Sequence, residues 1–375
     1  MTVHAPQDNA LNQSFFQSVP RVVRHALVQR VSELSSSTAL GEAASMAFVL
    51  MFKAKAQPDG AEQRRRELLA QSDHWFQTAV ASLGDDGLSL EAQLTAIADL
   101  QLCQLASAGA APAYAIQSIG EFFIHKAMGT RPVLDMSSTR ITPFMVHHAA
   151  RTDVLQALCL SNKRPTFRLV HLDESEACYR SHLGLPSALL TCLSDALHLA
   201  ADKAALPANE VAVRADVIEM AVAGWTATRP YESGLTGRAK LETVATEEMW
   251  RLAILVHLNA TVRGLGQLST PMRALLVELL AVGAGLARPA ARPADSASPF
   301  DAGLCACPWF LAATLAILPE EQAQCRAGLE ACGPQRVFTD NLAVVELFWR
   351  EAAATGFALD WKAFLASRNL FVAFF

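Results

Sequence analysis

Helical spacing of apolar residues is the feature of this chain that most constrains its fold. Between residues 89 and 107, apolar side chains stand three or four positions apart, with one adjacent pair, on one face of an α-helix: Leu90, Leu94, Ile97, Ala98, Leu102 and Leu105. Ser89 precedes them as a favourable N-cap, and Glu91 places negative charge in the first turn. The alternation that is typical of half-buried strands is nearly absent from the chain. Because such a helix cannot bury its apolar face alone, the sequence predicts helices packed against helices.

Comparable patterns predict about a dozen helices and therefore an all-α fold, an irregular multi-helix array that is bundle-like or solenoid-like. Proline suits the first turn of a helix, and Pro112, Pro143 and Pro186 each lie near a predicted start. Asp340 and Asp360 are predicted N-caps of the two final helices. The ranges that read as helical before them are 21–53, 61–83, 89–107, 112–124, 143–160, 186–200, 208–225, 244–263 and 270–286.

Two segments interrupt the helical pattern. Residues 1–20 are polar and lack the apolar stretch of a signal peptide, so we expect a disordered N-terminus there. Residues 285–302 contain three prolines together with Gly, Ala and Ser, which predicts a Pro-rich surface loop within one all-helical domain over residues 21–375. The apolar run near Ala274–Ala287 is interrupted by a glutamate and is too short to cross a bilayer, so we expect a soluble intracellular protein.

Charge and cysteine content exclude several classes of function. The formal net charge is −5, from 31 basic and 36 acidic residues, which argues against a protein that binds DNA through a basic face. The densest basic run, Arg64–Arg66, is followed at once by Glu67 and is expected to be a solvated helix face. The eight cysteines form no CxxC pair, which favours a reducing compartment without disulfides. Cys305 and Cys307 are a weak metal-site candidate without a second ligand pair, so buried thiols are the preferred interpretation.

Motifs of common catalytic sites do not occur. The chain contains no GxSxG, GxGxxG, GxxxxGK[ST] or HExxH sequence. His147 and His148 are adjacent on a predicted helix, where neighbours point about 100° apart and cannot share one metal ion. We expect one of them to be packed and the other solvated. His182, His198 and His257 lie on separate predicted helices among apolar residues and are expected to be core histidines with satisfied hydrogen bonds.

Enzymes of isoprenoid chemistry are the all-helical enzyme class that the sequence can test. They hold magnesium through an aspartate-rich DDxxD helix. Asp85 and Asp86 lie in a Gly-flanked turn without a third acid at that spacing. Asp340, Asn341 and Glu346 resemble the second metal-binding motif of these enzymes only weakly. We therefore assign no catalytic, cofactor-binding or metal-binding residue, and we expect the chain not to be an enzyme.

Five segments carry motifs that occur together in one family. A helix followed by a basic-Pro-aromatic loop occupies residues 147–167, and its motif residues are Asp153, Val154, Leu155, Arg164, Pro165 and Phe167. The others are a Leu-Gly-Leu-Pro helix start in 182–200, an Ala-rich helix with Trp-Arg in 245–265, a Pro-Trp helix in 307–317 and an Asp-Trp ending in 360–375. In this order they resemble the fungal-specific transcription factor domain, the regulatory domain of zinc binuclear cluster transcription factors.

This resemblance carries expectations for both fold and composition. It implies a helical regulatory domain, in which four tryptophans are expected at helix interfaces: Trp250, Trp309, Trp349 and Trp361. Members of the family normally carry an N-terminal zinc cluster built from six cysteines. The first cysteine here is Cys103, so we expect the chain to lack a DNA-binding module of its own.

The resemblance further implies a nuclear transcriptional regulator that needs no cofactor. It would act through other proteins, without direct sequence-specific DNA binding, and would control a pathway such as a secondary-metabolite gene cluster. Whether it forms homo- or hetero-oligomers is left open by the sequence. Two alternatives also stay open, which are an all-helical enzyme acting on an apolar substrate and a helical scaffold.

Overall fold

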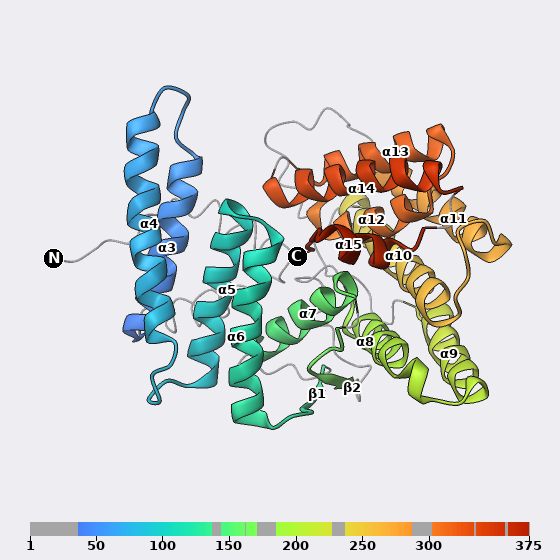
Figure 1. Ribbon diagram of the computed structural model, residues 1–375, viewed down its shortest axis with the longest axis horizontal. Helices are drawn as coiled ribbons and strands as arrows, with labels where there is room; N and C mark the ends of the chain where they lie inside the picture. The colour runs from blue at the N-terminus through green and yellow to red at the C-terminus, as the bar shows by residue number, and fades with distance from the viewer. Residues whose placement is uncertain are drawn as a thin grey trace.

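The computed structural model describes residues 37–136, 144–161, 163–170, 185–226, 237–286, 302–333, 335–356 and 359–374 (Figure 1). The α-helices in these ranges are α3 (Ala39–Lys55), α4 (Glu62–Ser82), α5 (Leu90–Ser107), α6 (Ala110–Met128), α7 (Phe144–Cys159), α8 (Ser187–Asp202), α9 (Ala208–Ala223), α10 (Gly237–His257), α11 (Thr270–Leu286), α12 (Ala306–Leu315), α13 (Pro319–Ala331), α14 (Arg336–Ala354) and α15 (Trp361–Arg368). Within the same ranges the strands are β1 (Val133–Asp135) and β2 (Arg168–Val170), which pair in parallel. The expected all-α array is confirmed.

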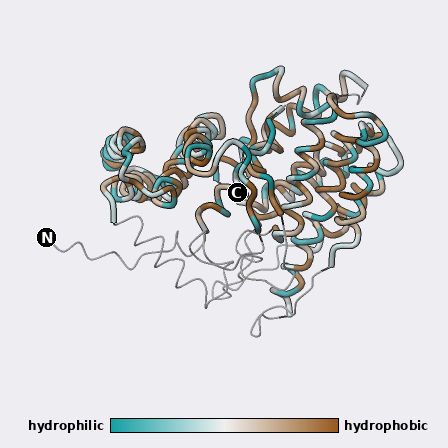
Figure 2. Tube along the Cα trace, turned by 90° about the horizontal axis from the view of Figure 1, so that it is seen from below, coloured by the Kyte–Doolittle hydropathy of each residue, from teal (hydrophilic) through white to brown (hydrophobic). Residues whose placement is uncertain are grey.

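Neighbouring helices pack in pairs, and the pairs build the array. α3 packs against α4 and α5, and α5 packs against α6, so these four helices form one end of the molecule (Figure 1). α7 lies between this end and the larger group of helices α8–α15, and it contacts α5, α6 and α8. Brown and teal alternate along the helical tubes in Figure 2, as expected for helices that bury one face.

α12 is the helix around which the larger group packs. All of its residues are buried, and it contacts α10, α11, α13 and α14. The indole of Trp309 on α12 lies between Gly283 of α11 and Gly328 of α13. A Cβ atom added to these glycines would stand 2.4 Å and 2.2 Å from ring atoms of the tryptophan. The missing side chains therefore allow α11 and α13 to approach the two sides of the ring.

The tryptophans lie at helix interfaces, as the sequence predicts. The four that were expected there are all buried: Trp250, Trp309, Trp349 and Trp361. The indole N–H of Trp250 donates to the carbonyl of Leu304 at 3.0 Å, and that of Trp349 donates to the carbonyl of Ala313 at 2.8 Å. Trp250 and Trp349 therefore each bury a large apolar area without leaving their single donor unsatisfied.

Local sequence signals are confirmed at two helix starts and on one helix face. The side chains of Ser89 and Asp360 accept hydrogen bonds from the backbone N–H groups of Ala92, at 3.2 Å, and Ala363, at 2.7 Å. Both residues are thus N-caps, of α5 and α15. The run Arg64–Arg66 lies on a solvent-accessible face of α4, where its guanidinium groups pair with two glutamates of the same helix.

The prediction that Asp340 caps a helix is wrong. α14 begins at Arg336, with Gln335 as its N-cap, so Asp340 lies one turn inside the helix. There its carboxylate pairs with Arg336 across one helical turn at 3.2 Å, which gives it a local partner that a capping model does not anticipate. The start of α8 also shifts by one residue, because Pro186 is the N-cap and Ser187 is the first helical residue.

Other boundaries differ from the sequence prediction as well. α10 begins at Gly237 instead of near residue 244, and it continues into a π-helical turn at Leu258–Val262. α6 begins at Ala110, two residues before Pro112. The sequence predicts neither strand, because three residues are too few to show an alternating pattern.

Several predictions concern segments outside the described residues. They are the disordered N-terminus at 1–20, the first part of the predicted helix 21–53, Pro143, His182 and the loop residues 287–301.

Replacing Gly283 by alanine should destabilise the protein. The new methyl group would overlap the Trp309 ring, and overpacking of this kind costs about 1–3 kcal/mol. The urea midpoint of unfolding should therefore fall for Gly283→Ala. Gly285→Ala is the matched control, because this glycine lies in the same helix with no atom within 4 Å of an added Cβ. Equal midpoints for the two variants would contradict the proposed packing.

Candidate functional site

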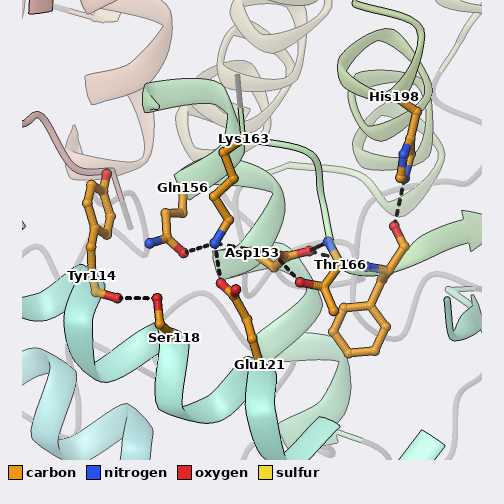
Figure 3. A network of polar contacts seen from close by, with 9 residues as sticks. Tyr114, Ser118, Glu121, Asp153, Gln156, Lys163, Thr166 and His198 are labelled. Atoms are coloured by element: carbon orange, nitrogen blue, oxygen red, sulfur yellow. Dashed lines mark hydrogen bonds and ion pairs between the residues drawn. The ribbon is translucent and has the colours of Figure 1, made fainter. Parts of the chain in front are cut away.

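Asp153 on α7 is the centre of a buried polar network (Figure 3). Its side chain is fully buried, with 0% exposed. One carboxylate oxygen accepts from the backbone N–H groups of Thr166, at 2.6 Å, and Phe167, at 3.3 Å, and the other accepts from the Thr166 hydroxyl at 3.0 Å. These bonds fasten the loop that leads into β2 to the middle of α7. The Asp-Val signature of the helix and the loop that follows it are therefore parts of one structural unit.

Lys163 connects this unit to α6. Its ammonium group pairs with the carboxylate of Glu121 on α6 and donates to the amide oxygen of Gln156 on α7 at 2.8 Å (Figure 3). The same nitrogen lies 4.0 Å from the carboxylate of Asp153. The side chains of Lys163 and Glu121 are only 16% and 19% exposed, so water screens the pair poorly. Lys163 thus interacts electrostatically with two acidic side chains at the contact between α6, α7 and the loop.

Burial controls the ionisation of Asp153. Loss of hydration raises the pKa of its carboxyl group to about 7, and the nearby charge of Glu121 acts in the same direction. The ammonium group of Lys163 and the N–H groups of Thr166 and Phe167 lower that pKa and oppose the shift. The hydrogen bonds and the lysine therefore offset part of the cost of placing a carboxylate in the interior, and the net shift of the pKa is still upward.

The far side of the loop is attached to α8. The guanidinium group of Arg164 donates to Nδ1 of His198 at 3.1 Å and to the carboxylate of Asp202 at 2.7 Å. Nε2 of His198 lies 2.9 Å from the carbonyl oxygen of Phe167. Because arginine can only donate, Nδ1 of His198 accepts, and the proton lies on Nε2 and is donated to that carbonyl. The histidine is held neutral in one tautomer, and burial lowers its pKa.

Together these contacts form a junction, in which one loop is joined to α6, α7 and α8. Asp153 and Arg164 hold opposite sides of one short loop, and the Phe167 ring between them is completely buried. The next residues of the chain form β2, which pairs with β1 in the register Leu134↔Leu169. The Asp153 carboxylate holds the loop against α7, while Lys163 joins the loop to α6 and Arg164 joins it to α8. These contacts therefore orient the three helices relative to one another.

Of the histidines that the sequence singles out, His198 belongs to the junction. The others in the described ranges are buried or half-buried, as are the two candidate cysteines. His147 is buried and His148 is half-buried, so the second is less solvated than expected, and burial lowers the pKa of each to about 4. His257 is buried on α10. Cys305 and Cys307 are buried thiols, as expected, and Sγ of Cys305 lies 3.6 Å from the hydroxyl of Thr246. Across the described ranges, no group of three or more His, Cys, Asp or Glu residues could hold a metal ion.

The acids considered for a magnesium site do not converge, and three of them, Asp86, Asp340 and Glu346, each pair with a different cation. Asp86 pairs with Lys126 at 2.9 Å on the surface. Glu346 pairs with Arg326 at 2.9 Å on α14, the helix that also carries Asp340. The described residues thus bring no set of these acids together around one point.

Comparison with known families identifies the family of the chain. A family model described as the fungal specific transcription factor domain matches residues 35–375. The chain belongs to this family. Membership gives it a role in the regulation of transcription, and the family is in general not enzymatic. No curated protein and no solved structure matches the chain. Among the helices in the described ranges, none has the length and apolarity needed to span a bilayer.

The sequence indicates part of the junction. Asp153, Arg164 and Phe167 are motif residues, and His198 is expected to be a core histidine, but neither its bond to Phe167 nor the part played by Glu121 is predicted. Glu121 precedes Lys163 by 42 residues and His198 follows Phe167 by 31, so no local periodicity relates them. Glu121 shares its helix face with Gln117, Ser118 and His125, so the local sequence does not distinguish it from a solvated acid.

Replacing Asp153 by alanine should destabilise the protein strongly. The change leaves Lys163 with one acid and removes the acceptor of the Thr166 and Phe167 N–H groups, and each buried donor left without a partner costs about 1–3 kcal/mol. Chemical unfolding followed by circular dichroism measures the loss. Asp86→Ala removes an exposed ion pair and should leave the unfolding midpoint nearly unchanged. A similarly small effect at both positions would show that the junction does not contribute to stability.

His198 should make stability depend on pH. Its folded-state pKa lies below the value of an unfolded histidine, so its contribution is present above about pH 6.5 and is lost as the pH falls through the lower folded-state pKa. The difference in unfolding free energy between wild type and His198→Gln should therefore shrink from pH 7.5 to pH 5. The other buried histidines are common to both proteins and cancel in the difference. A difference that is constant over this range would contradict the proposed tautomer.

Proposed function

We propose that the chain is a nuclear transcriptional regulator that acts through protein partners and does not itself recognise a DNA sequence. The observation that carries the proposal is the family match over residues 35–375, which includes the junction built around Asp153. A helical array of this size offers extended surfaces for other proteins. The pathway controlled is proposed to be one such as a secondary-metabolite gene cluster, on the strength of the family resemblance alone.

Electrostatics supports action through partners. The formal net charge of −5 opposes binding to a polyanion. The guanidinium groups of Arg64, Arg65 and Arg66 pair with Glu62 and Glu67, which reduces the positive potential of the densest basic run. A DNA reader needs unpaired cations along one face to displace counterions from phosphates.

Deletion of the gene should change the transcript levels of one pathway coherently. The test is transcript profiling of the deletion strain together with measurement of the pathway's product. Expression of the wild-type chain from another locus should restore both. Loss of a metabolite with unchanged transcripts would contradict the regulatory role and favour the all-helical enzyme. Unchanged transcripts and metabolites, with recovery of only structural proteins in pull-downs, would favour the scaffold.

A further inference from the structure

The chain after α15 is held like a bound peptide. At Asn369 the backbone adopts the left-handed conformation, with φ of 51°, and the helix ends. Residues 370–374, here called the tail, then continue without helical or strand hydrogen bonding. Val372, Ala373 and Phe374 are only 0%, 3% and 5% exposed. Extended backbone in the interior must find hydrogen-bond partners outside itself.

Side chains of two helices supply these partners. The amide of Asn341 on α14 donates to the carbonyl of Ala373 at 2.8 Å and accepts from the N–H of the same residue at 3.2 Å. The hydroxyl of Tyr114 on α6 donates to the carbonyl of Val372. The Asn341 amide thus contacts the tail through the pair of backbone groups that a neighbouring β-strand would use. Contacts of this kind are made to the backbone and do not depend on the sequence of the segment they hold.

Aromatic rings provide the selectivity that the backbone contacts lack. Phe371 meets the ring of Tyr114 edge to face with centroids 6.4 Å apart. Phe374 packs on Phe310 of α12 with centroids 5.4 Å apart. The tail-binding site, defined by Tyr114, Phe310 and Asn341, therefore accepts two phenyl rings three positions apart on an extended chain.

The tail is attached to the rest of the molecule mainly through residues that are distant in sequence. To its own helix it is joined by a bond from the N–H of Leu370 to the carbonyl of Leu365, at 2.9 Å, which closes the end of α15. The contacts of Val372 and Ala373 instead reach α6 and α14, 258 and 32 residues away. Release of the tail at Asn369 would therefore leave α15 and the tail-binding site intact.

We propose that the tail-binding site is a peptide-recognition site, which the chain's own tail occupies, and that an extended Phe-x-x-Phe segment of a partner protein binds there in place of the tail. The inference rests on the regulatory role proposed above and names the chemistry of one partner. Because the tail is covalently attached, its effective concentration is high and the partner's segment competes only when the tail is loosened.

The test measures binding of a fluorescent LFVAF peptide to the full-length chain by anisotropy. The double variant Phe371→Ser/Phe374→Ser weakens the tail and leaves the tail-binding site unchanged. It should bind the peptide about tenfold or more tighter than wild type does, because competition by the tail is reduced. Adding Asn341→Leu to this variant should remove the gain, since leucine has the same branched shape as asparagine and cannot hydrogen-bond to the backbone. A peptide with its two phenylalanines adjacent should bind weakly.

Equal affinity of the wild type and the tail variant for LFVAF would overturn the proposal, as would equal binding of the rearranged peptide.

Hydrogen exchange of the wild type covers the case in which the tail variant misfolds. The amide of Ala373 should exchange through local opening, about a hundredfold faster than the amides of α12. Exchange of both only by global unfolding would show that the tail never leaves. A concentration-dependent wild-type dimer formed by exchanged tails would overturn the partner assignment in favour of a second copy. The peptide assay has no transcriptional readout, so its failure would leave the regulatory role standing.

Discussion

The fold depends on burying one helix that has no polar face. Every residue of α12 is buried, so this helix must be surrounded on all sides, and α10, α11, α13 and α14 provide that cover. Its polar side chain, Thr314, bonds to the carbonyl of Leu311 at 2.7 Å and leaves no hydroxyl unsatisfied. The amphipathic helices around α12 then follow from the same requirement, because each turns its apolar face inward.

Polar groups enter this interior where segments distant in sequence must be joined. At the junction, Asp153 and Lys163 attach one loop to α6 and α7. At the tail-binding site, Asn341 and Tyr114 attach the tail to α14 and α6. α6 takes part in both, so this helix links the N-terminal end of the array to its C-terminal segment. Directional bonds in a low-dielectric interior fix these joins in a way that apolar contacts alone do not.

The sequence predicts most of what is local in this structure and little of what is not. N-caps at Ser89 and Asp360 follow from residue type and position, and the buried tryptophans follow from their size. Asp340 has the same local signature as Asp360, yet it lies inside α14, which begins at Arg336, and its carboxylate pairs with that arginine one turn earlier. A capping signal cannot separate these two outcomes without knowing where the helix begins.

The junction and the tail were visible to sequence reasoning only in part. The motif supplies Asp153 and Phe167, but their partners Glu121 and His198 become neighbours only when the helices pack. Residues 370–374 read simply as the end of an apolar C-terminal segment, since aromatic residues are common in both helices and extended chain. Their extended conformation depends on an asparagine in another helix, and no local propensity encodes that contact.

The indole of Trp309 between Gly283 and Gly328 couples the choice of residue at three positions on three helices. A lineage that keeps the tryptophan cannot enlarge either glycine without pushing two helices apart. A lineage that replaces the tryptophan by leucine opens a void that alanine at both glycine positions would refill. Substitutions at these sites should therefore appear together across relatives. The order in which they arise decides whether the core of the intermediate protein is overpacked or contains a cavity.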